Sequence, residues 1–305
     1  MIISYNDNFN FDLGVIGKLH PFDGTKFRRV YQAISQQDGF EFISPESGIS
    51  QVVIDEFVNR LVVRFLKSKV AIYRALEVPK IPFLGMEFLD KKILTPMRWG
   101  VAGTLLSAQT ALTNKFCWNL SGGYHHASQH SIEGFCIYND IGITYQELIK
   151  SGHLSETDKI LIIDTDAHHG NGNARTFLEN PNVTLLDIYN YNVYPKGVTR
   201  ERVDIEAPVP MGTQGKDYLA AYEEALSKIT QPYKIAFVVA GTDVLESDKI
   251  GGLKLSQDDV VTREVMTVKK LQEYDIPTVM LSGGGYSKQT ADAIVHAMKA
   301  VAPLL

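Results

Sequence analysis

The segment Ile160–Gly172 constrains this chain more than any other, because an apolar run ends there in carboxylates, imidazoles and glycines. It reads Ile-Leu-Ile-Ile-Asp-Thr-Asp-Ala-His-His-Gly-Asn-Gly. The apolar part predicts a buried strand of a parallel sheet. Alternate side chains of an extended backbone point the same way, so Asp164, Asp166 and His168 should share one side. A carboxylate and an imidazole at this spacing form half of a divalent metal site. The alternative is a buried polar network at a strand end, which the further polar clusters described below disfavour.

The length and composition predict one globular α/β domain spanning residues 1–305. The chain has 305 residues and is 45% hydrophobic, which is enough for a sizeable core. Its net charge of -5 argues against a nucleic-acid-binding surface. We find no internal repeat, low-complexity segment or long linker. Polar motifs recur from residue 121 to residue 286, and one site built from so much of the chain implies a single domain.

Cysteine content and the hydropathy pattern bear on the compartment. The only cysteines are Cys117 and Cys136, both in apolar contexts, so the sequence predicts no disulfide framework and indicates a reducing compartment. The opening residues lack a basic region followed by a long apolar core, so no secretory signal is predicted. No apolar run reaches about 18 residues, so no membrane span is expected. We therefore expect a cytoplasmic location, or a nuclear one in a eukaryote.

Strand and helix patterns alternate along most of the chain. The expected strands are Phe116–Leu120, Lys159–Asp164, Val183–Asp187, Lys234–Ala240 and Pro277–Leu281. The expected helices are Gly103–Thr113, Asn139–Lys150, Asp217–Lys228, Ser256–Tyr274 and Lys288–Ala300. This alternation predicts an open parallel sheet with helices on both faces. The first 90 or so residues are expected to be helices and loops packed on that sheet.

Four of the expected strands end in glycine together with a reactive side chain. The segments at these ends are Ser121–His126, Asp164–Gly172, Gly241–Asp243 and Ser282–Tyr286. Open α/β sheets bind ligands at the carboxyl ends of their strands. We therefore expect the four clusters to converge on one pocket.

Asp166, His168 and Asp243 are the candidate metal ligands. Three protein ligands leave one position open for water or substrate, which is typical of a catalytic zinc site. Such a metal acidifies water and polarises a carbonyl. A carboxylate in Gly-Thr-Asp would by itself be interpreted as a turn cap. The metal interpretation of Asp243 is preferred because the site otherwise lacks a third ligand.

The adjacent His125 and His126 follow a Gly-Gly turn and are candidates for acid–base chemistry. A metal hydrolase needs a base for water and an acid for the leaving amine, and histidine titrates in the right range. A carboxylate partner would raise the pKa of such a histidine, whereas a neutral amide would only orient it. Asp164 and Asn171 are candidates for these two partner roles.

Tyr286 follows three glycines and is a candidate oxyanion donor. Gly283–Gly285 would let the loop place the phenol over the metal. A surface tyrosine packing on a loop is the alternative.

Together these residues resemble the zinc-dependent histone deacetylases of the arginase/deacetylase fold, and within that family the class IV branch. The segments that carry the class IV resemblance are His20–Asp23, Asp164–Gly172 and Gly241–Leu253. Ser121–His126, Gly134–Cys136 and Ser282–Tyr286 match the family in order and approximate spacing. The resemblance runs from about residue 5 to the last residue.

The resemblance implies roles for the matching residues. Asp166, His168 and Asp243 would bind one Zn²⁺. His126 would be the general base. His125, backed by Asp164, would be the electrostatic and proton-transfer partner of that base. Tyr286 would be the oxyanion donor. Where class I and II enzymes place a second aspartate behind the base, this chain has Asn171, as the class IV pattern does. His126 should therefore be less basic than in those enzymes.

The resemblance also implies a substrate tunnel and a second ion. Gly134, Phe135 and Tyr194 resemble the walls of the tunnel that accepts a lysine stem, and Ile250 would lie at its rim. The family tends to bind a structural K⁺ through backbone carbonyls around Asp164–His168, a site that Asp187 would join by position.

The leading hypothesis is a zinc-dependent deacylase acting on acyl-lysine in proteins or peptides. The class IV resemblance implies long-chain fatty acyl-lysine as a substrate besides acetyl-lysine. Gly122, Gly123, Gly251 and Gly252 could leave room for such a chain, or they could serve only tight turns. The main alternative is an amidohydrolase of small acylated amines such as acetylpolyamines, which an acidic rim would favour. A two-manganese ureohydrolase would need further bridging carboxylates. An inactive acyl-lysine-binding module would have lost Tyr286 or the histidine pair.

Overall fold

The computed structural model describes residues 1–14, 17, 21–79, 84–195 and 201–305. These form an eight-stranded sheet in the order β2-β1-β3-β8-β7-β4-β5-β6, and every neighbouring pair is parallel. The strands are β1 (Ile2–Ser4), β2 (Glu41–Ile43), β3 (Phe116–Asn119), β4 (Ile160–Asp164), β5 (Val183–Asn190), β6 (Ile205–Val209), β7 (Ile235–Val239) and β8 (Thr278–Leu281). The α/β class with an open parallel sheet is confirmed.

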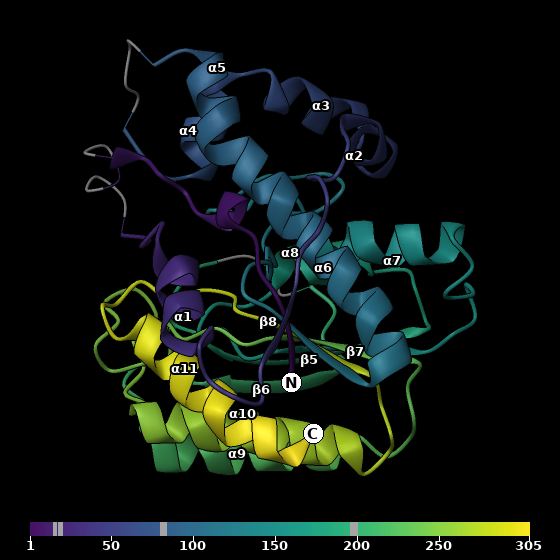
Figure 1. Ribbon diagram of the computed structural model, residues 1–305, viewed down its shortest axis with the longest axis vertical. Coiled ribbons are helices and arrows are strands. Elements are labelled where there is room, and N and C mark those ends of the chain that lie inside the picture. The colour runs from purple at the N-terminus through teal and green to yellow at the C-terminus, as the bar shows by residue number, and fades with distance from the viewer. Residues whose placement is uncertain (15–16, 18–20, 80–83, 196–200) are drawn as a thin grey trace.

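Helices cover both faces of the sheet. The main ones are α1 (Lys26–Ile34), α6 (Thr95–Asn114), α7 (Asp140–Lys150), α9 (Gly215–Ser227), α10 (Gln257–Gln272) and α11 (Thr290–Val301). Shorter ones are α2 (Gln51–Phe57), α3 (Arg60–Leu66), α4 (Lys69–Ala75), α5 (Met86–Leu89) and α8 (Asn171–Thr176). Figure 1 shows α6 and α7 on one side of the sheet, α9 to α11 on the other, and α2 to α5 grouped beyond α6.

The apolar run in β4 is buried on both faces, as expected for a central parallel strand. Ile160 and Ile162 pack in a cluster with residues of α6 and α7. Leu161 and Ile163 belong to a second cluster, which includes residues of α9, α10 and α11. The period-two alternation therefore divides one continuous hydrophobic run between two cores.

Local signals explain where the helices begin. Ser256 caps α10 in a reciprocal capping box with Asp259. The Asn139 side chain caps α7 by accepting from the Gly142 amide. Helix α6 begins at Thr95, eight residues before the expected start at Gly103. Pro96 is tolerated because the first helical turn needs no N–H from it.

The expectation for the first 90 residues was incomplete. This region does hold helices, but it also supplies β1 and β2, while β6 at the opposite edge was also missed. β1 and β2 are three residues each, too short to show an alternating pattern. β6 contains Pro208, which an edge strand tolerates because one side of its ladder has no partner.

The strand register brings the four polar clusters to one edge. Asn119 of β3 and Val239 of β7 both pair with Leu281 of β8, and Asp164 of β4 pairs with Val239. The loops that follow these strands therefore start at one level. Cys117 and Cys136 are buried free thiols, and no described helix is long and apolar enough to cross a membrane.

Candidate active site

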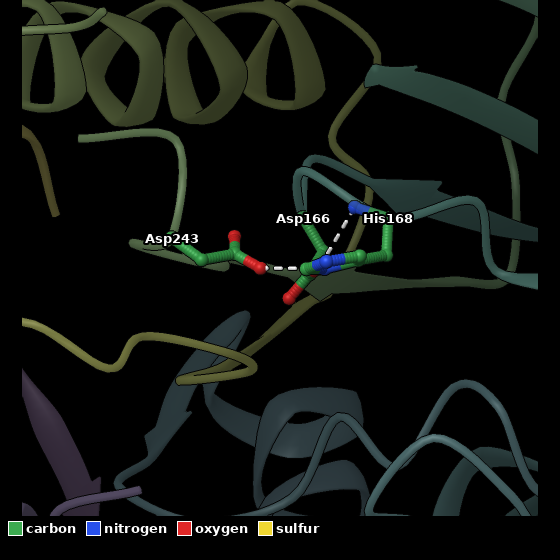
Figure 2. A group of neighbouring side chains, drawn as sticks. All are labelled: Asp166, His168 and Asp243. Carbon is green, nitrogen blue, oxygen red and sulfur yellow. Dashed lines mark hydrogen bonds and ion pairs between the residues drawn. The ribbon is translucent and has the colours of Figure 1, made fainter. Parts of the chain in front are cut away.

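Asp166, His168 and Asp243 meet at the carboxyl ends of β4 and β7 (Figure 2), and one ligand atom from each lies within 4.8 Å of the others. His168 Nδ1 lies 3.0 Å from Asp166 Oδ1 and 2.8 Å from Asp243 Oδ2. All three residues are buried. Two carboxylates and an imidazole suit a zinc-like divalent ion.

The surroundings of these side chains fit a cation. Among the described residues, none makes a well-aligned hydrogen bond to Asp243 Oδ2, even though His168 is near. Burial, and then the charge of Asp166, raise the pKa of the Asp243 carboxyl to about 7. The other Asp243 oxygen accepts from the Ala167 amide at 2.9 Å, which fixes the orientation of the carboxylate. A buried carboxylate close to a second carboxylate is stabilised when a cation binds both.

The two adjacent histidines have different partners in nearly the same geometry. His125 Nδ1 lies 2.7 Å from Asp164 Oδ2, and His126 Nδ1 lies 2.6 Å from Asn171 Oδ1. Their ring centroids are 4.0 Å apart. Because the Asn171 oxygen only accepts, His126 Nδ1 carries the proton and its Nε2 is left as the basic nitrogen.

Different neighbouring charges shift the pKa values of the two imidazoles in opposite directions. Burial would lower the pKa of His125, but Asp164 and Asp166 outweigh it and raise that pKa to about 9. Burial, and then His125 and His168, hold the pKa of His126 well below its usual value. These shifts favour the charged form of His125 and the neutral form of His126, and a general base must be neutral.

The glycine loop after β8 carries Tyr286 and is tied to the metal ligands. The Gly284 amide donates to Asp166 Oδ2 at 2.9 Å. The Tyr286 ring lies between Phe22 and Phe135, with centroid distances of 6.2 and 5.6 Å. Burial, and then Asp166 and Asp243, raise the pKa of the phenol well above its usual value, so Tyr286 remains a proton donor.

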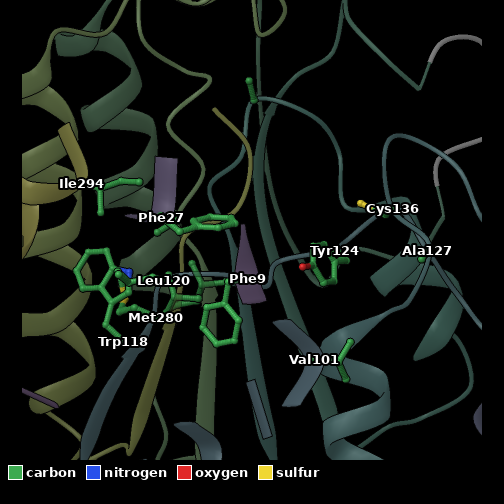
Figure 3. Packing of buried hydrophobic residues seen from close by; sticks show 14 of the residues in the cluster. Phe9, Phe27, Val101, Trp118, Leu120, Tyr124, Ala127, Cys136, Met280 and Ile294 are labelled. Carbon is green, nitrogen blue, oxygen red and sulfur yellow. The ribbon is translucent and has the colours of Figure 1, made fainter. Parts of the chain in front are cut away.

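A cavity of about 430 Å³ opens beside these residues. Its floor includes Asp166, His125 and Gly284. Its walls are mainly apolar side chains from the N-terminal segment, α1, α4, α5, α6 and the described residues between α4 and α6: Phe11, Leu13, Phe22, Phe27, Tyr73, Leu76, Val78, Leu84, Phe88, Leu89, Ile93 and Met97. Phe27, Tyr124 and Cys136, labelled in Figure 3, belong to the hydrophobic core and line this cavity too.

The four expected substrate-binding residues lie in different places. Gly134 and Phe135 line the cavity, together with Tyr286. Tyr194 is not among the described lining residues; its ring instead packs edge-on against His126, at a centroid distance of 5.0 Å. Ile250 is not among them either, and its amide donates to Asp248 Oδ1 at 2.9 Å. The expected positions of Gly122 and Gly123 beside the cavity agree with the structure.

Of the two expected reasons for these glycines, the structure favours tight turns. A Cβ on Gly122 would lie 2.6 Å from Thr104 Oγ1, and one on Gly123 would lie 2.9 Å from Gly283 Cα. Both have positive φ. A Cβ on Gly251 would lie 2.0 Å from the Asp243 carbonyl oxygen. These glycines therefore serve turns and close packing, and the space beside the metal ligands is set by the surrounding apolar walls.

Four buried polar residues that the sequence interpretation passed over hold the site in place. Arg263 of α10 donates to the carbonyls of Thr165 and Gly241 at 2.9 and 2.8 Å, which supports the ends of β4 and β7. Asp140 accepts from the Gly123 and Tyr124 amides at 2.9 and 2.8 Å, directly before the histidine pair.

The other two hold the glycine loop. Lys26 is fully buried and donates to the Gly283 carbonyl at 2.8 Å. Asp248 accepts from the Tyr286 amide at 2.7 Å. Lys26 and Asp248 stand next to or within motifs quoted from the sequence, which was the available signal. His20, from the first of those motifs, lies outside the described residues.

Comparisons with known proteins agree with this geometry. A family model described as "Histone deacetylase domain" matches residues 20–302. Histone deacetylase 2 of Arabidopsis thaliana is 32% identical over 97% of this chain and 77% of that protein. Histone deacetylase 1 of Homo sapiens is 30% identical over 55% of this chain and 36% of that protein. The solved structure of an HDAC homolog from Aquifex aeolicus superposes with a TM-score of 0.74 at 20% identity, covering 98% of this chain and 83% of the other. At that identity the structural likeness establishes the shared arginase/deacetylase fold.

Proposed function

We propose that this chain, which belongs to the histone deacetylase family, is a zinc-dependent deacylase that hydrolyses Nε-acyl-lysine in proteins or peptides. The carrying observation is the pair of adjacent histidines, one bonded to a carboxylate and the other to an amide, beside Asp166, His168 and Asp243. Amide hydrolysis at a metal centre uses a base for the attacking water and groups that stabilise the developing oxyanion. The histidine with the amide partner suits the first task, and the histidine with the carboxylate partner can add positive charge for the second.

In the proposed reaction, each side chain has one task. Zinc held by Asp166, His168 and Asp243 would polarise the acyl carbonyl and acidify water. His126 takes a proton from the attacking water at Nε2 while Asn171 holds its Nδ1–H. As the amide C–N bond breaks, His126 gives that proton to the leaving lysine amine.

Two further groups stabilise the developing negative charge. The Tyr286 hydroxyl donates to the oxyanion on the acyl carbon. The His125 cation, fixed by Asp164, lies against the His126 ring and favours the transition state electrostatically.

We further place the chain in the class IV-like branch. The neutral amide behind His126 supports this assignment, because the class I and II pattern has an aspartate there. The 2.6 Å contact between Asn171 and His126 makes the amide the direct partner of the base.

We propose long-chain fatty acyl-lysine as a substrate besides acetyl-lysine. The mainly apolar lining of the 430 Å³ cavity supports this, since an acetyl methyl group would bury little of it. Burial is favourable by about 0.8 kcal/mol per methylene. The same lining disfavours acetylpolyamines, for which an acidic rim was expected. Of the acidic side chains at the cavity, Asp23 is already paired with Arg29 at 2.8 Å.

A peptide series tests this proposal. One lysine peptide carrying acetyl, octanoyl, dodecanoyl or myristoyl groups is assayed at fixed sequence. We expect kcat/KM to rise with chain length by at least tenfold before it levels off, because several methylenes enter the cavity. A steady fall with length would leave a plain deacetylase. No hydrolysis of any member by zinc-loaded protein would refute the deacylase itself.

We also propose that a structural K⁺ can bind near Asp187. The observation in favour is a buried Asp187 Oδ1 without a hydrogen-bond partner among the described residues. Its other oxygen accepts from the Gly170 amide at 2.9 Å and lies 2.7 Å from His169 Nδ1. Titration with KCl at constant ionic strength should raise the thermal unfolding temperature of the wild type and not of Asp187→Ala. An equal response in both would contradict the site.

A further inference from the structure

Four side chains beside the proposed general base form one connected group, here called the Glu133 cluster: Glu133, Arg175, Tyr194 and Glu201. The Tyr194 hydroxyl donates to Glu133 Oε2 at 2.6 Å. Arg175 Nη1 binds Glu133 Oε1, and Arg175 Nε binds Glu201 Oε1 at 2.6 Å. A tyrosine is thereby linked through a carboxylate to an arginine.

Three of the four members of the cluster are connected to residues of the proposed site. Glu133 directly precedes Gly134 and Phe135, which line the cavity. Arg175 lies on α8, the helix whose first residue is Asn171. The Tyr194 ring packs edge-on against His126. The cluster therefore connects the cavity loop, the helix that holds the base and the ring that flanks the base.

The contacts are partly shielded from water. The side chains of Glu133, Arg175 and Glu201 retain 30%, 24% and 22% of their full exposure, so their ion pairs are less screened than fully exposed ones. Burial, and then the hydrogen bond to Glu133, raise the pKa of Tyr194, so this phenol stays protonated and donates. A hydrogen bond from a phenol to a carboxylate is stronger than a hydrogen bond between two neutral groups.

Both oxygens of the Glu133 carboxylate are engaged by other side chains. One oxygen binds Arg175 and the other accepts from Tyr194. We therefore expect Glu133 to act mainly through the groups that it holds.

His126 is closely enclosed by the parts that the cluster connects. A Cβ on Gly134 would lie 2.3 Å from His126 Cδ2, so the loop backbone is packed directly on the imidazole. Asn171 binds His126 Nδ1 from another side. A displacement of this loop or of the Tyr194 ring would therefore move the ring that accepts the proton. Displacements of about 1 Å can lower a rate by a hundredfold.

We propose that Glu133 is a positioning residue for His126: held by Arg175, it fixes Tyr194 and the Gly134–Phe135 loop against the imidazole. This inference rests on the proposed function only in so far as His126 is the base. The contacts between Glu133, Arg175 and Tyr194 stand independently of the reaction.

A double-mutant cycle tests the inference. Glu133→Ala, Tyr194→Phe and the double variant are assayed as zinc-loaded protein on the preferred acyl-lysine peptide. We expect Glu133→Ala to lower kcat by about tenfold with a smaller change in KM, because the base is displaced while most of the cavity wall comes from other segments. In the Glu133→Ala background, the further change Tyr194→Phe should lower kcat by less than another twofold. Effects that multiply would show that the two residues act independently and would overturn the inference.

Conservative and matched variants separate positioning from general destabilisation. Glu133→Gln keeps an acceptor for Tyr194 and should recover part of the loss in kcat. The chain also holds a matched set that does not line the cavity: Tyr5 donates to Asp7 at 2.6 Å, and Asp7 pairs with Arg28 at 3.3 Å. Tyr5→Phe and Asp7→Ala should leave kcat within about twofold of the wild type. Equal losses in these controls would contradict a role specific to the Glu133 cluster.

Hydrogen–deuterium exchange gives a readout that needs no turnover. The Phe135 amide donates to the Ala75 carbonyl at 2.9 Å, so its exchange reports how firmly the loop is held. Peptides covering residues 131–138 should exchange faster in Glu133→Ala than in the wild type, at an unchanged unfolding temperature. Unchanged exchange would overturn the inference. A wild type that hydrolyses no acyl-lysine, combined with faster exchange in the variant, would refute the proposed function and keep the structural link.

Discussion

Replacing Asn171 by aspartate should raise the pKa of His126 and move the acidic limb of the activity profile to higher pH. The His125–Asp164 pair in the same chain shows the effect of a carboxylate in the position that Asn171 occupies. His125 and His126 each face a side-chain oxygen through Nδ1, at 2.7 and 2.6 Å. The partner is a carboxylate in the first case and an amide in the second. With the carboxylate the pKa is about 9, and with the amide it is held well below its usual value.

The size of the shift follows from the charge that is added. An opposite charge in direct contact shifts a pKa by about 1–3 units. The new carboxylate would be buried, and burial opposes its ionisation, so we expect a shift of about 1–2 units. Among the described residues, none accepts a hydrogen bond from Asn171 Nδ2, so replacing that amide nitrogen by oxygen breaks no bond. The fold should therefore survive the substitution.

The sign follows from the role of the base. Below its pKa His126 carries a second proton and cannot accept one from water, so a raised pKa removes activity over a wider acidic range. The assay is kcat/KM against pH from about 5 to 10 in the zinc-loaded protein, because this ratio reports the free enzyme. The lower apparent pKa should rise in Asn171→Asp.

Asn173→Asp is the matched control for the added charge. Asn173 is on the same helix, but its side chain accepts from Asn139 at 2.8 Å and not from His126. In Asn173→Asp, the lower apparent pKa of the kcat/KM profile should shift by less than half as much as in Asn171→Asp. An unchanged or lowered limb in Asn171→Asp would show that Asn171 does not partner the base.

Three further predictions concern the metal, the oxyanion and the support beneath the site. Wild-type protein should bind about one zinc-like ion per chain, and Asp243→Ala should lose both the metal, measured by elemental analysis, and hydrolysis; full activity after rigorous metal removal would refute the metal assignment. Tyr286→Phe should lower kcat by roughly a hundredfold with a modest change in KM, and a wild-type kcat would remove Tyr286 from the mechanism. Arg263→Met leaves the buried Glu264 without its cation and should cost about 3–5 kcal/mol of unfolding free energy in urea; a change below about 1 kcal/mol would show that this buried pair is not needed.

Much of the site could be predicted from the sequence because its residues lie close together along the chain or directly after apolar strands. Asp164, Asp166 and His168 follow from the alternation of one strand. The convergence of Asp243 and Tyr286 with them follows from a rule of parallel sheets, in which the carboxyl ends of the strands share one edge. The structure brings these side chains together. Their chemical roles remain predictions.

The tertiary structure alone decided the parts that depend on contacts between distant segments. β1 and β2 are strands only because they pair with each other and with β3, since three residues carry no readable period. The Lys26 contact with Gly283 joins residues 257 positions apart, and the Tyr194 contact with Glu133 joins residues 61 apart. No local pattern encodes such pairs.

The acyl cavity shows the same division. The glycines in the sequence left open whether there is room beside the metal ligands, and the room is enclosed by apolar side chains from the N-terminal segment, α1, α4, α5, α6 and the described residues between α4 and α6. The sequence by itself determined the parallel α/β sheet and the reactive groups at its edge, because strand alternation and strand-end chemistry are local. The packing of distant segments decided the shape of the cavity and the charge state of each histidine, because burial and neighbouring charges arise only in the folded chain.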